Sequence, residues 1–243
     1  MPSYHVVAES EHELQNPTSP DKIRLLGDRM RLGPGSNALD VASGRGGPAI
    51  ILADTFGCCI TCVERADEFD EAARRGAHEK GLDQLIEFVH ADARDFLADA
   101  REYDLAMCLG ASFVWGGLPG TLAALDPAVR AGGSIAVGEP YWRTWPLPDR
   151  AEPDEGEDFL PLLETIERLR TAGLELVTFI DASLDDWDRY ESLHWLTAEE
   201  WLAKHADEPD AEEVRILTQR FRDRYLRWQR ELLGWAILVG RKR

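Results

Sequence analysis

The chain has 243 residues, 44% of them hydrophobic, and its formal net charge is −18. This length suits one domain with a buried core, and the negative charge argues against nucleic acid as a partner, because phosphate contacts need a basic surface. No apolar run is long enough to span a membrane, and the first five residues lack the apolar stretch of a signal peptide. We therefore expect a cytoplasmic protein that binds neither membranes nor nucleic acid, and we leave its oligomeric state open.

Residues 1–33 are predicted to form a segment that caps the rest of the domain. A polar, proline-bearing stretch ends in Asn16-Pro17-Thr18-Ser19-Pro20. It leads into a helix whose apolar positions are Ile23, Leu26 and Met30, and glycine and proline near residue 34 end that helix.

Residues 34–142 alternate between short apolar runs and helical patterns. Strands are expected at 37–41, 58–63, 86–90, 103–109 and 134–138, with helices near 47–56, 66–80, 93–99 and 118–130. Such alternation, with nearly continuous apolar strands, is typical of a parallel sheet covered by helices on both faces. The sequence therefore predicts an α/β fold of the doubly wound type.

Residues 143–243 have a different pattern and are predicted to form the variable, substrate-side part. The acid- and proline-rich stretch 143–158 indicates an exposed loop. A helix near 159–172, a strand at 174–180, an aromatic segment at 183–195, a long helix at about 210–231 and a closing strand at 235–240 follow. We expect all three parts, 1–33, 34–142 and 143–243, to belong to one domain.

The most informative stretch is Leu39–Gly47, where an apolar strand enters a glycine-rich turn and a helix follows. Gly44 and Gly46 allow the backbone to approach a ligand, and the helix N-terminus offers free N–H groups. Asp40 stands at the strand end, ahead of the glycines. A site that holds only phosphates has little use for an anion there, whereas an ammonium or sulfonium ligand does.

Two further acids stand at the ends of the next expected strands. Glu64 lies 20 residues after Gly44 and can accept both hydroxyls of an adenosine ribose, and Asp92 can accept the adenine amino group. Each acid also has a structural interpretation, because either one can stabilise the N-terminus of the helix that follows it. Three acids at three successive strand ends are nevertheless an improbable coincidence.

These segments resemble the class I S-adenosylmethionine-dependent methyltransferases. The residues that carry the resemblance are Leu39–Gly46, Val63-Glu64, His90-Ala91-Asp92-Ala93 and Arg130–Ser134. Segments Asn16–Pro20, Leu109–Ser112 and Gly138–Trp142 also resemble a bacterial branch of small-molecule enzymes in that family. The resemblance implies a Rossmann-like, mostly parallel seven-stranded sheet with an antiparallel final strand. It also implies an N-terminal helical segment and a helical insertion before the last strand.

The resemblance implies S-adenosyl-L-methionine as the cofactor and assigns residues to its parts. Asp40, Ala42, Ser43, Gly44 and Gly46 would surround the methionyl part, with Leu109 at the same end; Glu64 would hold the ribose, and Arg65, Asp92 and Ala93 the adenine. Family members usually carry glycine where Ala42 stands. If this residue adopts a positive φ, the alanine should weaken cofactor binding. Arg45 is expected to face solvent rather than the cofactor carboxylate.

The expected reaction is direct displacement of the methyl group from a sulfonium by a small-molecule acceptor. Glu139, Tyr141 and His194 are the candidate catalytic residues, with His12 as a further candidate for a base. Each has a structural alternative: Glu139 can pair with Arg143, and His194 can simply be a surface or packed histidine. The acceptor atom stays undetermined.

Aromatic side chains gather in the variable parts, at Trp115, Tyr141, Trp142, Trp145, Trp187, Tyr190 and Trp195. They can enclose an apolar or cationic substrate, although packing between the insertion and the sheet is the favoured interpretation. Cys58, Cys59, Cys62 and Cys108 fall in expected buried strands, and the local ligands of a zinc site are missing, so no metal is predicted.

Two other functions compete with methyl transfer. Gly44-x-Gly46-x-x-Ala49 followed by Glu64 also satisfies the fingerprint of a nicotinamide-dependent oxidoreductase. Asp40, Asp92 and the closing strand argue against that class. A non-catalytic binding or interaction protein on the same fold is the second alternative, which Ala42 and the lack of an obvious base leave open.

Overall fold

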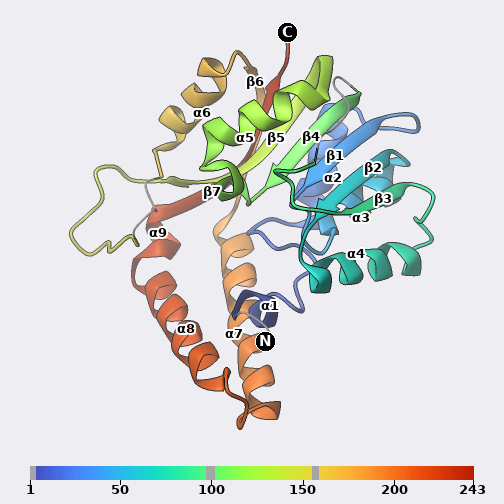
Figure 1. Cartoon of the computed structure of the whole chain (residues 1–243). Coiled ribbons are helices and arrows are strands. Elements are labelled where there is room, and N and C mark those ends of the chain that lie inside the picture. Colours follow the sequence, from blue (N-terminus) through green and yellow to red (C-terminus); the bar gives the residue numbers. More distant parts are fainter. Residues whose placement is uncertain (1–3, 97–101, 155–158) are drawn as a thin grey trace.

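The computed structural model describes residues 4–96, 102–154 and 159–243, which are built around a seven-stranded sheet (Figure 1). Its strands are β1 (Asn37–Val41), β2 (Cys59–Glu64), β3 (Ile86–His90), β4 (Tyr103–Leu109), β5 (Val129–Trp142), β6 (Glu175–Asp181) and β7 (Leu233–Arg241). Their order is β3-β2-β1-β4-β5-β7-β6. Only β7 is antiparallel to its neighbours, β5 and β6. The predicted fold class is therefore confirmed.

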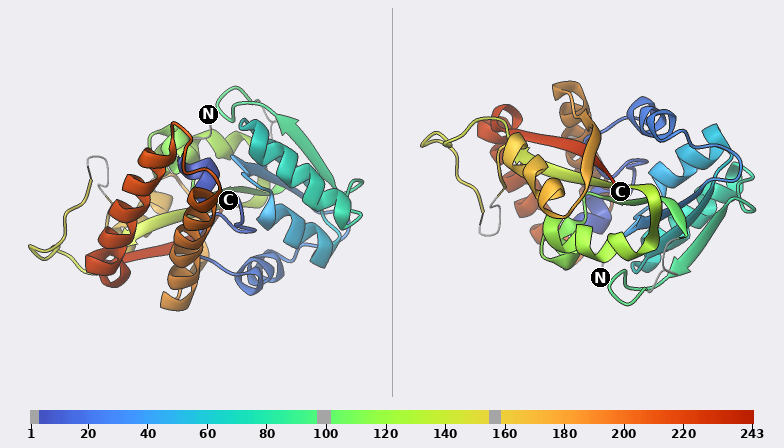
Figure 2. Two further views of the ribbon diagram at one scale, coloured as in Figure 1. Left: turned by 90° about the horizontal axis from the view of Figure 1, so that it is seen from below. Right: turned by 90° about the horizontal axis from the view of Figure 1, so that it is seen from above.

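Helices cover both faces of the sheet, as nearly continuous apolar strands require. On one face lie α2 (Pro20–Met30), α3 (Gly47–Phe56) and α4 (Asp67–Glu79), whose apolar residues share a core with β1, β2 and β4. On the other lie α5 (Leu118–Leu125) and α6 (Leu162–Thr171). Figure 2 shows α5 and α6 on the side of the sheet opposite α2 and α3.

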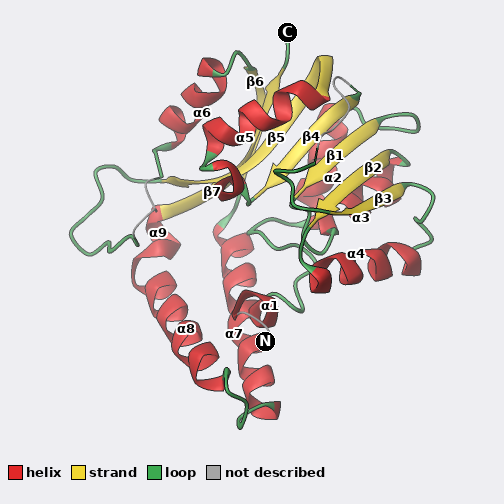
Figure 3. Cartoon of the chain, viewed as in Figure 1, coloured by secondary structure: helices red, strands yellow, loops and turns green. Residues whose placement is uncertain are grey.

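A pair of helices between β6 and β7 extends beyond the edge of the sheet (Figures 1 and 3). These are α7 (Leu184–Lys204) and α8 (Ala211–Arg224), and α8 continues through a π-helical turn, Tyr225–Gln229, into α9 (Arg230–Leu232). A short N-terminal helix, α1 (Tyr4–Ala8), packs on the pair. A small apolar cluster joins them, made of Tyr4, Val7, Ala8, Ala198, Leu202, Ala211 and Val214. The predicted N-terminal helical segment and helical insertion are both present.

Several predicted boundaries were wrong. The expected helix 118–130 ends at Leu125, because Pro127 follows within a short 3₁₀ turn and β5 begins at Val129. Strand β5 is longer than the predicted 134–138, and the predicted helix 210–231 is interrupted by the π turn. Of the helix expected near 93–99, residues 93–95 form a turn, and residues 97–99 lie outside the described residues.

The aromatic segment 183–195, for which the sequence predicts neither helix nor strand, belongs to α7 and its N-cap. Ser183 caps this helix in a capping box with Asp186, a pattern that marks helix starts in sequences. Trp142 and Trp187 are buried in the main core, as the packing interpretation predicted, while Trp145 is 61% exposed. Cys58, Cys62 and Cys108 are buried free thiols, whereas Cys59 is exposed, contrary to expectation.

Within the described ranges, no helix combines the length and the apolar character that crossing a membrane requires. The carboxyl ends of β1 and β4 are the place where a ligand site is expected, because the chain connections turn away in opposite directions there.

The start of α7 is fixed to α2 through one buried carboxylate. Asp186 accepts hydrogen bonds from the Ser183 backbone N–H (2.8 Å) and hydroxyl (2.6 Å), and it forms an ion pair with Lys22 of α2. The same lysine donates to the carbonyl of Asp181 at 2.6 Å. Burial tends to raise the pKa of Asp186, but the bonds from Lys22 and Ser183 hold it below its ordinary value.

We expect Asp186→Ala to lower the free energy of unfolding by about 2 kcal/mol, because it leaves the buried partners of the carboxylate unsatisfied. Urea denaturation at neutral pH measures this. The control is Asp185→Ala, which removes a neighbouring, 83% exposed acid and should change stability by less than about 0.5 kcal/mol. Equal effects of the two substitutions would contradict the role given to Asp186.

Candidate functional site

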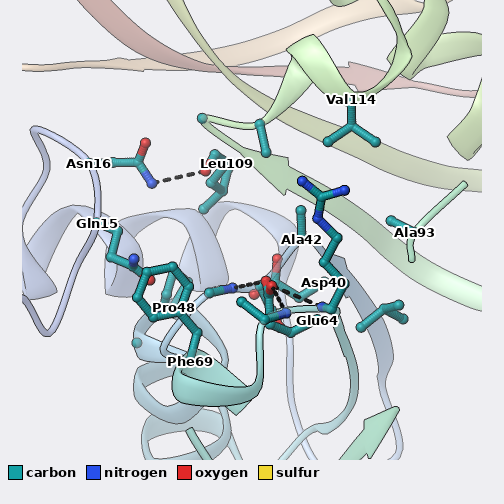
Figure 4. Close-up of a pocket in the computed structure, with 18 of the residues that line it drawn as sticks. Gln15, Asn16, Asp40, Ala42, Pro48, Glu64, Phe69, Ala93, Leu109 and Val114 are labelled. Atoms are coloured by element: carbon teal, nitrogen blue, oxygen red, sulfur yellow. Dashed lines mark hydrogen bonds between the residues drawn. The ribbon is translucent and has the colours of Figure 1, made fainter. Parts of the chain in front are cut away.

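A cavity of about 760 Å³ opens at the carboxyl edge of the sheet (Figure 4). Its walls come from the β1–α3 turn, the ends of β2 and β4, the residues after β3, and the N-terminal segment. Nine of the ten predicted cofactor residues line it: Asp40, Ala42, Ser43, Gly44, Glu64, Arg65, Asp92, Ala93 and Leu109. These nine predicted residues therefore lie together in one cavity.

The β1–α3 turn has three residues in the left-handed region, Ala42 (φ 50°), Gly44 (φ 56°) and Gly46 (φ 72°). Gly46, the tenth predicted residue, does not line the cavity. It precedes α3, and a Cβ there would lie 3.0 Å from the Ala73 Cβ, so glycine allows α3 and α4 to approach each other. Ala42 adopts a left-handed conformation that suits glycine better than alanine, so it carries backbone strain.

The N-terminal segment lies against this turn. The Gln15 Oε1 atom accepts a hydrogen bond from the Arg45 N–H (2.7 Å), and the Asn16 Nδ2 atom donates to the Leu109 carbonyl (2.9 Å). A Cβ on Gly44 would lie 2.0 Å from the Gln15 Oε1 atom, so only glycine allows this approach. Gln15 and Asn16 both line the cavity. Neither is among the predicted site residues, although Asn16 begins the Asn16–Pro20 segment of the resemblance.

Glu64 is buried and accepts three backbone hydrogen bonds. Its Oε2 atom accepts from Gly44 (2.8 Å), and its Oε1 atom accepts from Arg65 (2.9 Å) and Ala66 (2.8 Å). The latter two amides precede α4, as the helix-terminus interpretation predicted. A carboxylate has about four acceptor positions, so Oε2 retains one that is free for a ligand.

Asp92 is held by two arginines. It accepts from the Arg94 backbone (2.9 Å), Nε (3.0 Å) and Nη2 (2.7 Å) atoms, and from the Arg65 Nη1 atom at 3.4 Å. These hydrogen bonds, those of Arg94 foremost, hold the pKa of Asp92 below its ordinary value. In this arrangement its acceptor positions are filled, and the Arg94 side chain, 58% exposed, would have to move for Asp92 to accept from a ligand.

Asp40 contrasts with Glu64 and Asp92, whose carboxylates each accept several hydrogen bonds. It is 2% exposed, and its Oδ2 atom has no hydrogen-bond partner among the described residues. Burial, with a smaller contribution from the charge of Glu64, raises the pKa of Asp40 to about 7. A buried carboxylate with an unused oxygen in a cavity wall is a site for a cationic or hydrogen-bond-donating ligand.

The three candidate catalytic residues do not line the cavity. Glu139 is buried on β5, and burial raises its pKa to about 7. The Tyr141 hydroxyl donates to Asp181 at 2.7 Å, and burial raises the pKa of this phenol. Arg143 contacts Tyr141 (3.2 Å) and Asp181 (3.4 Å), rather than pairing with Glu139.

His194 reaches the cavity indirectly. Its Nε2 atom lies 3.7 Å from Oε1 of Glu9, which lines the cavity. His12 stacks on His194 with ring centroids 4.3 Å apart, and its Nε2 atom lies 3.0 Å from the Tyr190 carbonyl oxygen. Burial lowers the pKa of His12 to about 4, so this histidine is neutral near pH 7. Sequence reasoning found the two histidines but missed Glu9, the acid that connects them to the cavity.

Comparison with known proteins identifies the family. Residues 38–133 match the family model described as a methyltransferase domain. The chain is 33% identical over 243 residues to the YjhP protein of Escherichia coli (strain K12), covering 98% of each. Its structure matches that of an S-adenosylmethionine-dependent methyltransferase from Thiobacillus denitrificans, solved with S-adenosyl-L-homocysteine, with a TM-score of 0.92, 34% identity and coverage of 100% and 99% of the two chains. The chain belongs to the class I S-adenosylmethionine-dependent methyltransferases.

A more distant relative has a named substrate. This chain is 27% identical over 178 residues to the sarcosine/dimethylglycine N-methyltransferase of Halorhodospira halochloris, and the match covers 66% of this chain and 61% of that protein. The predicted enzyme class and cofactor, S-adenosyl-L-methionine, are thus confirmed over the nicotinamide-dependent alternative.

The cavity fits that cofactor. It offers an unpartnered buried carboxylate for a positively charged group, a glycine-containing turn that a ligand can approach, and one free acceptor position on Glu64. Its volume of about 760 Å³ lies in the range of cofactor sites.

We expect Ala42→Gly to raise the free energy of unfolding by about 0.5–1 kcal/mol, because glycine adopts the left-handed region without strain. Chemical denaturation measures it. The control is Ala111→Gly, because Ala111 lines the same cavity at an ordinary φ of −127°. Glycine at this position raises the conformational entropy of the unfolded chain and should therefore lower the free energy of unfolding. If both substitutions destabilise alike, Ala42 carries no strain.

Asp40→Asn should change how stability depends on pH. The folded pKa of Asp40 is about 7, whereas an unfolded aspartate titrates near 4. The fold therefore binds an extra proton between these values, and it loses stability as the pH rises through them. The free energy of unfolding of Asp40→Asn minus that of the wild type should therefore be about 2 kcal/mol larger at pH 8 than at pH 5. Urea titrations at both pH values give this difference, and a pH-independent difference would show that Asp40 is not a buried acid of raised pKa.

Proposed function

We propose that this enzyme transfers a methyl group from S-adenosylmethionine to a small molecule, with the cofactor held between the β1–α3 turn and the ends of β2 and β3. The bound cofactor supplies an electrophilic methyl group on its sulfonium. Asp40 is the observation that carries this placement, because its unpartnered buried carboxylate suits the positively charged methionyl end. Ala42, Ser43, Gly44 and Leu109 form the surrounding wall.

Glu64 would accept from the ribose while it holds the turn in shape. The free position on Oε2 is adjacent to the bond from Gly44, so one carboxylate positions both the turn and the sugar. Arg65, Asp92 and Ala93 would lie beside the adenine. Because Arg94 occupies acceptor positions of Asp92, Arg94 would have to rotate toward solvent before the adenine amino group could donate a hydrogen bond to Asp92.

The remaining wall is left for the methyl acceptor. His5, Glu9 and Tyr190 come from the helices α1 and α7 and the residues around them, and Phe113 and Val114 follow β4. A small acceptor suits this space. The net charge of −18 speaks against nucleic acid, and the relative named for sarcosine and dimethylglycine acts on small amines.

Rate acceleration would come chiefly from alignment and from exclusion of water, because the leaving sulfide is already activated. Gln15 and Asn16 hold the N-terminal segment over the turn and so close this side of the cavity. Among the candidate catalytic residues, His194 is the one connected to the cavity wall, through Glu9. Glu139 and Tyr141 are proposed only as supports of the β5 end.

The test is ligand binding by isothermal titration calorimetry. S-adenosyl-L-homocysteine should bind to the wild type, NAD and NADP should not, and Glu64→Gln should weaken binding about tenfold or more, because it removes both the ribose acceptor and the support of the turn. The control is Glu68→Gln, an exposed acid on α4. Binding of NAD alone, or an unchanged affinity in Glu64→Gln, would overturn the proposed placement.

A further inference from the structure

One acid of the cavity wall stands outside the cofactor region. Glu9 follows α1 and faces the same space as the glycine turn, with its side chain 15% exposed. Its Oε2 atom accepts from Gln15 Nε2 at 2.6 Å, and its Oε1 atom accepts from the Tyr190 hydroxyl at 3.4 Å. Gln15 in turn accepts from Arg45 of the turn, so Glu9 is held at a fixed position relative to the cofactor region.

The charge of Glu9 is not cancelled by a permanent cation. Among the described residues its ion-pair partner is His194, at 3.7 Å, and neither lysine nor arginine contacts it within ion-pair distance. Burial tends to raise the pKa of Glu9, but the interaction with His194 and the hydrogen bond from Gln15 outweigh burial, and the pKa lies below its ordinary value. The carboxylate is therefore ionised at neutral pH.

The other acids of the cavity are in different surroundings. Glu64 is bonded to three backbone amides, Asp92 is paired with two arginines, and Asp40 lies beside the glycine turn at the cofactor end. Glu13 is exposed, where solvent weakens its attraction for a charged group. Glu9 is the remaining acid that is both partly buried and turned toward the acceptor space.

Aromatic rings stand beside this carboxylate. Tyr190 and His5 line the same wall, and Tyr190 packs edge-on against His194 with centroids 4.4 Å apart. Burial and the neighbouring charge of Glu9 raise the pKa of Tyr190, so it remains a neutral hydrogen-bond donor. An anion flanked by aromatic rings is the arrangement that recognises organic ammonium groups.

We propose that Glu9, flanked by Tyr190 and His5, binds a cationic group of the methyl acceptor, so that the substrate is a small molecule carrying an organic ammonium. His194 and Gln15 act as positioning residues that fix the carboxylate. This inference rests on the proposed function, since it takes the cofactor to fill the opposite end of the cavity.

Pairs of probes that match in shape but differ in charge test this inference directly. Choline is compared with 3,3-dimethyl-1-butanol, and cyclohexylammonium with cyclohexanol, by calorimetric titration into wild-type protein saturated with S-adenosyl-L-homocysteine. At least one cation should bind about tenfold more tightly than its neutral partner. This comparison requires no variant and is unaffected by folding defects.

Glu9→Gln should abolish the preference for the cationic probe while retaining the hydrogen bond from Gln15. The control is Glu11→Gln, at an exposed acid two residues further on, which should preserve the preference. Equal binding of cation and neutral probe, no binding of either cation, or an unchanged preference in Glu9→Gln would overturn the inference. Binding of S-adenosyl-L-homocysteine is measured first in each protein. If the wild type does not bind it, the proposed function fails, and this outcome is distinct from a failure of the inference about Glu9.

Discussion

The site depends on how the β1–α3 turn is held from both sides. The Glu64 carboxylate accepts from the Gly44 amide, and the Gln15 amide oxygen accepts from the Arg45 amide. One partner comes from β2 and the other from the N-terminal segment, so two parts of the chain that are distant in sequence stabilise the turn. Three residues of the turn are left-handed, and this conformation is intrinsically unfavourable for Ala42, the alanine among them. The two hydrogen bonds stabilise the turn in this conformation.

This constraint connects parts that are distant in the sequence. Gln15 bonds to both Glu9 and the turn, and Glu9 lies against Tyr190 and His194 of α7. The α7 helix is itself fixed to α2 through Asp186 and Lys22. The β1–α3 turn and α7 are therefore connected by hydrogen bonds through Gln15 and Glu9, and not by the sheet alone.

The sequence predicted the sheet well and placed nine of the candidate cofactor residues in one cavity, because both inferences rest on local signals. Apolar runs mark the strands, and acids at strand ends such as Glu64 meet at one edge of any parallel sheet. The wall proposed for the acceptor was harder to predict. Glu9 has no distinctive local pattern, because its contacts are with Tyr190 and His194, more than 180 positions away. The strand-end position of Tyr141 predicted a side chain in the crevice, whereas its hydroxyl donates to Asp181 and it does not line the cavity.

Ala42 and Asp40 together explain why this wall is poorly satisfied without a ligand. One holds a strained backbone, and the other has a buried carboxylate whose Oδ2 atom is unpartnered among the described residues and whose pKa is raised to about 7. A positively charged ligand group beside Asp40 favours the ionised carboxylate and reverses that shift. Binding would then release a proton from the fraction of Asp40 that is neutral near pH 7, and the cost of burying this acid is offset only in the complex. With the cofactor placed as we propose, a stabilising substitution at Asp40 would also remove an interaction with the charged end of the cofactor, which is the usual conflict between stability and function at a ligand site.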